Sequence, residues 1–350
     1  MASFRTVAGI ATVALLLPAA AQAKTKEMYA GPPQATAKKL GETTIANAFF
    51  PSKLTVNVGD SVQFIPAGFH SVHLPKRHQG AVPFIVPAGQ KVAGATDAAG
   101  AAFWFNGQDA MSLNPAFAAS AFGKKFTYNG AKDVQSGLPG EGAKPMTVKF
   151  TKAGTYTVYC DLHPGMEATV KVAKKGAKVP TAKQDAAAVA KQAKAVLKTA
   201  KGLENANPGA NTVDLGSAGK GGVEYFGMVP SNLTVAPGTT VKFQMTSKSY
   251  EAHTATFGPG DINDPKSYLG AIVASLESPQ IDPKAVYPSD VTPVAVNPKL
   301  HGNGFWNSGV LDADSKSVLP VSASVKFDTP GTYTYYCLIH PFMRGTITVQ

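Results

Sequence analysis

A short motif occurs twice in the chain, and each copy follows a similar longer run. The motif is Cys-x2-His-x2-Met, beginning at Cys160 and again at Cys337, and these are the only two cysteines among 350 residues. The residues leading into each cysteine also match, because residues 150–160 read FTKAGTYTVYC and residues 327–337 read FDTPGTYTYYC. A repeat of this length indicates a duplicated domain and not a solenoid, whose units are much shorter.

The duplication extends to the start of each copy and carries a strand pattern. Residues 51–64 read PSKLTVNVGDSVQF, and residues 230–243 read PSNLTVAPGTTVKF. Leu54, Val56 and Val58 alternate with polar residues before a Gly-Asp turn, which is typical of a half-buried β-strand. Many such short strands with glycine and proline turns predict an all-β chain with two tandem antiparallel sandwiches. We place the domains at residues 24–175 and 213–350.

The segment between the two domains, residues 176–212, is rich in alanine and lysine. Thr181 is a suitable helix N-cap and Gly202 a suitable stop, so the segment predicts a helical linker. Four apolar residues share one face of this helix: Val189, Ala193, Val196 and Ala200. The helix is either a solvated spacer or, through its lysines, a basic dock for an anionic surface.

Residues 1–23 have the pattern of a secretory signal peptide, with Arg5, a short apolar run and an Ala-Gln-Ala end at Ala23. The alternative is an N-terminal membrane anchor, although the apolar run is shorter than the roughly 20 residues that span a bilayer. The sequence therefore predicts an exported protein that is periplasmic, on the cell surface or extracellular, with no stable membrane insertion.

Composition narrows the classes of partner. Apolar residues make up 44% of the chain, so it can form packed cores, and the formal net charge is +11. This charge favours contact with acidic proteins or an anionic envelope surface. Nucleic acid is not an expected partner, because the lysines are scattered and no recognition motif is present.

The repeated motif supplies a thiolate, an imidazole and a thioether, which are three of the four ligands of a blue-copper site. A disulfide between the two cysteines would consume both loops, and zinc binds methionine poorly. The fourth ligand must be an upstream histidine. Aligning the copies pairs His70 with His253 and His73 with Thr256. His70 and His73 also point to opposite faces of a strand, so we select His70.

These motifs resemble the cupredoxin (plastocyanin/azurin) family, and the short copper loops are similar to those of amicyanin. The resemblance covers the two ends of each domain and implies Greek-key β-sandwiches. It also implies an exported electron carrier that is not an enzyme and has type 1 (blue) copper, with two ions per chain. The implied ligands are, for copper 1, His70, Cys160, His163 and Met166, and for copper 2, His253, Cys337, His340 and Met343.

The resemblance further implies that the loop histidine of each site has an exposed edge through which electrons pass. Ser71 and Thr254, which follow the upstream histidines, are expected to tie the two ligand loops together by hydrogen bonds. Leu162 and Ile339 replace a proline of amicyanin-like loops. Their N–H groups would point at the cysteine sulfur and raise the reduction potential.

Each domain contains a long segment that we interpret as an insertion, residues 75–125 and residues 258–300. We expect the aromatic residues of these regions to be core residues, and we align residues 305–309 with residues 126–130. His73, His78 and His301 are expected to be surface or hydrogen-bonding histidines and not ligands.

Two other functions remain open. A copper oxidase or reductase would need further histidines, yet the chain has seven histidines in all and no His-x-His pair. A sequestration or delivery protein would usually carry Met-rich or His-rich tracts, which are missing. Electron transfer to redox partner proteins is preferred. Glu167 and Arg344, each next to a ligand methionine, predict differently charged partners for the two sites.

Overall fold

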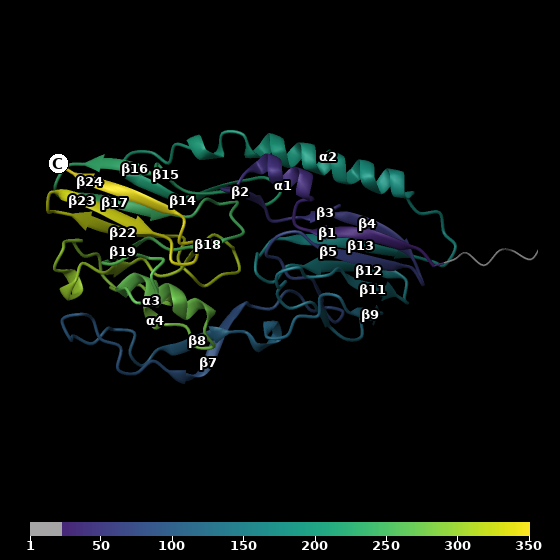
Figure 1. Ribbon diagram of the computed structural model, residues 1–350, viewed down its shortest axis with the longest axis horizontal. Helices are drawn as coiled ribbons and strands as arrows, with labels where there is room; N and C mark the ends of the chain where they lie inside the picture. The colour runs from purple at the N-terminus through teal and green to yellow at the C-terminus, as the bar shows by residue number, and fades with distance from the viewer. Residues whose placement is uncertain (1–22) are drawn as a thin grey trace, which may run out of the picture.

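The computed structural model describes residues 23–350, which form two β-sandwiches with a long helix, α2, along one side (Figure 1). Residues 1–22 of the predicted signal peptide lie outside the described residues. Within the described part, no helix is long and apolar enough to cross a membrane.

The first sandwich packs two five-stranded sheets face to face. One sheet has the order β3-β1-β5-β11-β9, with strands Phe49–Phe50, Thr25–Ala30, Ser61–Pro66, Met146–Phe150 and Lys125–Tyr128. The other has the order β10-β6-β12-β13-β4, with strands Val134–Gln135, His73–Leu74, Gly154–Tyr159, Glu167–Ala173 and Lys53–Asn57.

The predicted strand alternation builds the core of this sandwich. Leu54 and Val56 are buried in β4, while Lys53 before them is exposed and Thr55 between them is only half-buried. They pack with inward residues of the opposite strands, such as Phe64 and Val148. Each such side chain contributes about 1.5–3 kcal/mol through burial, which fixes the strand register.

The second sandwich repeats this arrangement. One sheet has the order β2-β15-β14-β17-β22, with strands Thr44–Ala46, Val223–Val229, Thr212–Gly219, Thr239–Gln244 and Ser322–Phe327. The other has the order β16-β24-β23-β19-β20, with strands Asn232–Val235, Arg344–Val349, Gly331–Tyr336, Thr256–Phe257 and Trp306–Asn307. A further pair joins β18 (Ala252–His253) to β21 (Leu311–Asp312). The predicted fold class of two tandem β-sandwiches is therefore confirmed. The sheets are mixed and not purely antiparallel as predicted, because β1 pairs parallel with β5 and β14 pairs parallel with β17.

Strand β2 belongs to the second sandwich in space, although it lies in the first fifty residues. It pairs antiparallel with β15 in the register Ala46 opposite Val223 and Thr44 opposite Tyr225. The next residue, Asn47, donates its backbone N–H to the carbonyl of Gly222 at 2.7 Å. The two halves of the chain are thus interlocked and not merely tethered by a linker.

The long segments of the two domains meet in a third apolar cluster beside the second sandwich. The first contributes a hairpin, β7 (Ile85–Lys91) with β8 (Asp109–Leu113), while the 3₁₀ helix η1 (Pro115–Phe117) of the same segment lies outside the cluster. The second contributes α3 (Tyr268–Ala274), α4 (Pro283–Val286) and the 3₁₀ helix η3 (Ser275–Glu277), while Leu300 of the 3₁₀ helix η4 (Leu300–Gly302) packs on the core of the second sandwich. Phe103 and Phe105 are buried there with Leu269 and Phe305, so these aromatics are core residues as expected. Trp104 is 38% exposed and is not a core residue.

The predicted alignment of residues 305–309 with residues 126–130 is wrong. Strand β20 pairs with β19 as β10 pairs with β6. The hydroxyl of Ser308 accepts the N–H of Ala255 at 2.9 Å, and the hydroxyl of Ser136 accepts the N–H of Val72 at 2.8 Å. The structural counterpart of Ser308 is therefore Ser136. Both segments begin with phenylalanine and end in a turn with asparagine and glycine, which suggested the alignment. Turns of this composition recur in unrelated loops, so the similarity does not indicate equivalent positions.

Helix α2 (Ala182–Ala200) begins as the sequence predicts, with Thr181 and Gln184 forming a capping box. Its predicted apolar face packs on both halves of the chain, against Phe50 and Val223, together with α1 (Gln34–Leu40) and η2 (Leu203–Asn205). Gln192 also bonds the backbone of β3 at Phe49. The helix is a packed brace and not a solvated spacer. Docking of its exposed lysines on an anionic surface stays a prediction.

Candidate metal centres

Each Cys-x2-His-x2-Met motif forms a tight loop between two antiparallel strands, β12 and β13 in one domain and β23 and β24 in the other. In the first loop the N–H of Cys160 donates to the carbonyl of Met166 at 3.0 Å, and the N–H of Met166 donates to the carbonyl of His163 at 2.9 Å. The second loop repeats both bonds between the equivalent residues, at 3.0 and 2.8 Å. The backbone thus brings all three side chains of each motif to one end of the sandwich.

The first site gathers His70, Cys160 and His163. The two histidine Nδ1 atoms lie 3.0 Å apart, and Cys160 Sγ lies 3.3 Å from Nδ1 of His163 and 3.9 Å from Nδ1 of His70. All three residues are buried, and Met166 of the same loop is only 1% exposed. The upstream histidine chosen by comparing the repeats is therefore the one that meets the loop.

The second site gathers His253, Cys337 and His340 in the same way. Their Nδ1 atoms lie 3.1 Å apart, and Cys337 Sγ lies 3.6 Å from Nδ1 of His253 and 3.8 Å from that of His340. His253 and Cys337 are fully buried, and Met343 is 1% exposed. Among the histidine, cysteine and acidic side chains of residues 23–350, these two clusters are the ones whose ligand atoms lie close enough together to hold a metal ion.

The donor atoms of both sites fit a copper ion. In each site two imidazole Nδ1 atoms face each other at about the distance of a hydrogen bond, and a sulfur atom faces both. Nitrogen lone pairs that converge in this way repel one another unless a proton or cation lies between them. Two imidazoles and a thiolate, with a methionine in the same loop, form the donor set that copper prefers over zinc.

The remaining histidines have the roles that the sequence predicts. His73 in β6 is buried, and its Nδ1 lies 3.0 Å from the carboxylate of Asp161. His301 lies between Asp97 and Asp290, at 3.1 and 3.2 Å. His78 is exposed. All three are outside the two clusters.

The hydroxyls after the upstream histidines tie the ligand loops together, as predicted. Ser71 Oγ accepts the N–H of Asp161 at 2.9 Å, and Thr254 Oγ1 accepts the N–H of Leu338 at 2.8 Å. In each site the bond joins the residue after the histidine to the residue after the cysteine. These bonds hold the ligands in place when the charge of the site changes.

Two glycines that the sequence analysis missed lie against the upstream histidines. Gly31 follows β1 with φ +107°, and a Cβ there would lie 2.8 Å from Cδ2 of His70. Gly216 in β14 has φ +77°, and its Cβ would lie 3.1 Å from Nε2 of His253. Equivalent strands thus leave room for equivalent rings. The signal in the sequence was weak, because the chain contains 34 glycines.

The two cysteines differ in their surroundings. Burial raises the pKa of Cys160, but the charge and hydrogen bond of His163 outweigh it and hold the pKa at about 5. Burial raises the pKa of Cys337 to about 11, although N–H groups of Thr254, His340 and Ile339 counteract it. The backbone donor that lies within hydrogen-bond distance of Cys337 Sγ is the N–H of Thr254, at 3.4 Å, so a bond from the N–H of Ile339 stays a prediction. The described contacts of Cys160 Sγ are with side chains, and the N–H of Leu162 is not among them.

The expectation that His163 has an exposed edge is wrong. His163 is 7% exposed, and its Nε2 lies 2.9 Å from Oε1 of Glu251 in the second domain. Tyr250 covers the same loop, since a Cβ on Gly165 would lie 2.6 Å from its ring. The side chain of His340 keeps 16% of its surface exposed. One loop histidine is therefore covered by the partner domain, and the other remains partly open.

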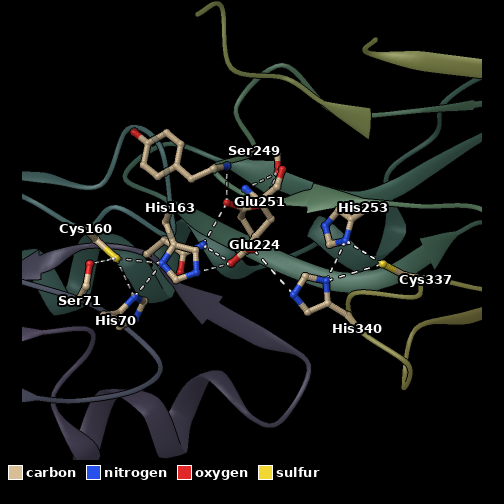
Figure 2. A network of polar contacts seen from close by, with 12 residues as sticks. His70, Ser71, Cys160, His163, Glu224, Ser249, Glu251, His253, Cys337 and His340 are labelled. Carbon is tan, nitrogen blue, oxygen red and sulfur yellow. Dashed lines mark hydrogen bonds and ion pairs between the residues drawn. The ribbon is translucent and has the colours of Figure 1, made fainter. Parts of the chain in front are cut away.

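Figure 2 shows the polar network that lies between the two clusters. Oε1 of Glu251 contacts Nε2 of His163, and Oε2 of Glu251 lies 3.8 Å from Nε2 of His340. Asn47 Nδ2 donates to both Glu251 and Glu224, at 3.0 and 3.3 Å. Burial raises the pKa of Glu224 to about 7. Burial also raises that of Glu251, but the charge of His163 outweighs it and brings the pKa to about 2.

The fold and the donor sets define a copper-binding protein with cupredoxin sandwiches. A model of the copper-binding proteins of the plastocyanin/azurin family matches residues 37–173 and 311–350, about half of the chain. The chain therefore belongs to the plastocyanin/azurin family of copper-binding proteins.

Individual relatives match smaller parts. Amicyanin-alpha of Methylorubrum extorquens (strain AM1) is 59% identical over 27 residues, which is 8% of this chain and 23% of that protein. The oxidised plastocyanin of Dryopteris crassirhizoma is 22% identical over 40% of this chain and 99% of its own, with a TM-score of 0.21. Amicyanin from Paracoccus versutus is 16% identical over 42% of this chain and 88% of its own, with a TM-score of 0.22.

Proposed function

We propose that the chain is an exported electron carrier that binds one copper ion in each domain at a type 1 (blue) site. The observation that carries the proposal is the double occurrence of a buried set of two histidine Nδ1 atoms and one cysteine sulfur, each with a buried methionine in the same loop. The proposed ligands are the eight residues of the two sets named from the sequence. When bound, copper would supply a one-electron couple between its two oxidation states.

The residues around the sites support this role. Ser71 and Thr254 fix the loops, and the backbone at Gly31 and Gly216 lies close against the upstream rings. A rigid cage that is complete in the folded chain changes little when the charge within it changes. Small rearrangement is what fast electron transfer requires, whereas a delivery protein needs a site that opens.

The stoichiometry and type of site are tested by copper loading of the protein. We expect two equivalents per chain, with the intense visible absorption and the narrow paramagnetic splitting of a copper–thiolate bond. Cys160→Ala and Cys337→Ala should each retain one equivalent. Binding of a single equivalent by the unmodified chain, or colourless copper, would contradict the proposal.

Sequestration or delivery and a catalytic role are distinguished by two further measurements. Retention of both ions through repeated oxidation and reduction in the presence of a copper chelator supports an electron carrier, and release supports a delivery protein. A third copper signal of a different class would indicate an enzyme. Export is tested by expressing the full chain and sequencing the N-terminus of the mature product, which we expect to begin at Lys24.

A further inference from the structure

The two candidate sites meet across a single side chain, Glu251. Its Oε1 atom lies 2.9 Å from Nε2 of His163, and its Oε2 atom lies 3.8 Å from Nε2 of His340. Figure 2 shows the carboxylate between the two imidazoles, each of which turns its Nδ1 toward its own cysteine. One carboxylate therefore faces the loop histidines of both domains.

Glu251 is built into this position. It is 8% exposed, and it lies directly before β18, two residues ahead of His253. Its N–H donates to Ser249 Oγ at 3.1 Å, and the side chain of Asn47 donates to its Oε1 at 3.0 Å. Asn47 comes from the first half of the chain, so both domains hold the carboxylate.

Glu224 stabilises the turn at residues 249–251 without contacting a ligand histidine. Its carboxylate accepts the N–H of Tyr250 at 2.6 Å and the hydroxyl of Ser249. It also accepts a hydrogen bond from Asn47. These bonds leave the residues before His253 a single conformation, in which the side chain of Glu251 points into the interface.

The charge environment gives Glu251 a defined role. Burying a carboxylate is costly unless positive groups or hydrogen-bond donors compensate it. Within residues 23–350, the only ion-pair partners of Glu251 are the two histidines, and no lysine or arginine contacts it. A carboxylate that accepts an imidazole Nε2–H fixes the tautomer in which Nδ1 is free to bind a metal.

We propose that Glu251 is a positioning residue shared by both sites, and that it couples them through the route His163–Glu251–His340. It orients the imidazole of His163 through the 2.9 Å contact, acts on His340 through its charge at 3.8 Å, and makes the properties of each site depend on the state of the other. This inference rests on the proposed function. Electrons then pass between the two domains inside the chain, the site that gives one being oxidised and the site that receives one being reduced, with no further reactant.

The route also assigns different tasks to the two loops. His163 is covered by Glu251 and Tyr250, whereas His340 is partly open beside Phe342, which is 59% exposed. An external redox partner therefore meets the second domain, and the first domain exchanges electrons through the second.

The first test needs no copper. In the metal-free full chain, proton–nitrogen spectra of the histidine side chains should show a protected Nε2–H on His163. Glu251→Leu has a similar size but no atom that can accept this N–H, and we expect the protection to be lost. Glu42→Leu, the same change at an exposed position, should preserve it. Protection that survives in Glu251→Leu, with the folded spectrum intact, would overturn the proposal.

The second test measures coupling in the copper-loaded chain. The midpoint potential of the second site is compared between the full chain and Cys160→Ala, and the comparison is repeated in the Glu251→Gln background. We expect filling the first site to shift the potential of the second, and the shift to be lost without the carboxylate. An unchanged shift argues against the bridge.

The two tests separate failure of the bridge from failure of the proposed function. If the chain binds no redox-active copper, the proposed function fails, and the metal-free spectra still decide whether Glu251 orients His163. If both coppers are redox-active, Glu251→Leu leaves the spectra unchanged and Glu251→Gln leaves the coupling unchanged, the function stands and the bridge is rejected.

Discussion

At the scale of single residues, the two sites share their ligands but not the groups around the sulfur. Cys337 Sγ accepts the N–H of Thr254, and backbone groups of its own loop favour its charged form, whereas the described contacts of Cys160 are with His70, His163 and Ser71. Hydrogen bonds to a thiolate withdraw charge from it and favour the electron-rich reduced state. The two sites should therefore differ in potential although their motifs are nearly identical.

Replacing Ile339 with proline removes a backbone N–H that favours the charged form of Cys337. We expect the midpoint potential of the second site to fall by tens of millivolts, because one hydrogen bond of about 1 kcal/mol corresponds to about 40 mV for one electron. Leu162→Pro is the matched change in the first loop and should have the smaller effect. Protein-film voltammetry of both variants decides, and an equal fall in both would contradict this interpretation.

The buried carboxyl group of Glu224 should make the free energy of unfolding depend on pH. Its pKa is raised from 4.5 to about 7 because burial and the neighbouring Glu251 disfavour the charge. A folded-state pKa above the unfolded value stabilises the fold fully below about pH 4.5, and this contribution is lost as pH rises through about 7. The shift corresponds to about 3 kcal/mol. Glu224→Gln should abolish this loss.

The measurement is the free energy of unfolding by denaturant of the copper-free protein at pH 4.5 and pH 8. The difference between the unmodified protein and Glu224→Gln isolates Glu224 from other groups that titrate in the range. Parallel stability profiles for the two proteins would show that folding does not raise the pKa of Glu224.

Comparison of the repeats was enough to select His70 and His253, because a ligand must appear in both copies. The same comparison could not identify Glu251, which is aligned with Gly68 and has no equivalent in the first copy. Its role depends on how the domains meet, and no local pattern encodes that. The sequence offered one signal for Glu251. It is a charged residue directly before the strand of a ligand histidine, and it occurs in one copy only.

At the scale of elements, the segment before β18 covers the β12–β13 loop, while the β23–β24 loop keeps an exposed aromatic rim. The cover depends on close approach, because Gly165 has φ +99° and faces the ring of Tyr250. In the second loop the corresponding position is Phe342. The difference between the loops that is visible in the sequence is thus explained by what packs on each.

Gly165→Ala should destabilise the fold more than Gly59→Ala. Both glycines have nearly the same positive φ, +99° and +97°, so both variants lose about 1–2 kcal/mol through backbone strain. A Cβ on Gly59 meets nothing within 4 Å, whereas one on Gly165 would displace Tyr250. Chemical unfolding measures both losses, and equal losses would mean that Tyr250 does not press on the loop.

At the scale of the whole molecule, the two halves of the chain build each other. Strand β2 extends a sheet of the second sandwich, and Phe103 and Phe105 fill a cluster that includes Leu338 of the second ligand loop. The strand patterns predicted the sandwiches. They gave no information on which sandwich a short edge strand or an inserted hairpin would join, because those contacts are between segments far apart in sequence.

Phe105→Ala should disturb the second site, although residue 105 lies in the first half of the chain. The side chain is fully buried, so its truncation costs about 3–5 kcal/mol and loosens the cluster around Leu338. We expect the spectrum of the copper held by Cys337 to change and that of the copper held by Cys160 to stay the same. Thermal melting and paramagnetic spectra provide the readout.

Phe117→Ala is the control for this variant. Phe117 lies in the same long segment and is 5% exposed, but it packs on Phe84 and not in the third cluster. It should lower the melting temperature without affecting either copper. A disturbance of both sites by both variants would mean that the long segments stabilise the molecule as a whole and not the second loop in particular.

The pairing of β2 with β15 has a consequence for the order in which the molecule assembles. The partners lie in residues 44–46 and 223–225, so the edge strand leaves the ribosome long before its neighbour is synthesised. Until then its backbone groups have no strand to bond, and pairings of such long sequence separation form slowly. A nascent chain therefore has to keep this strand away from other chains. A chaperone that holds extended segments during synthesis would increase the yield of the folded protein.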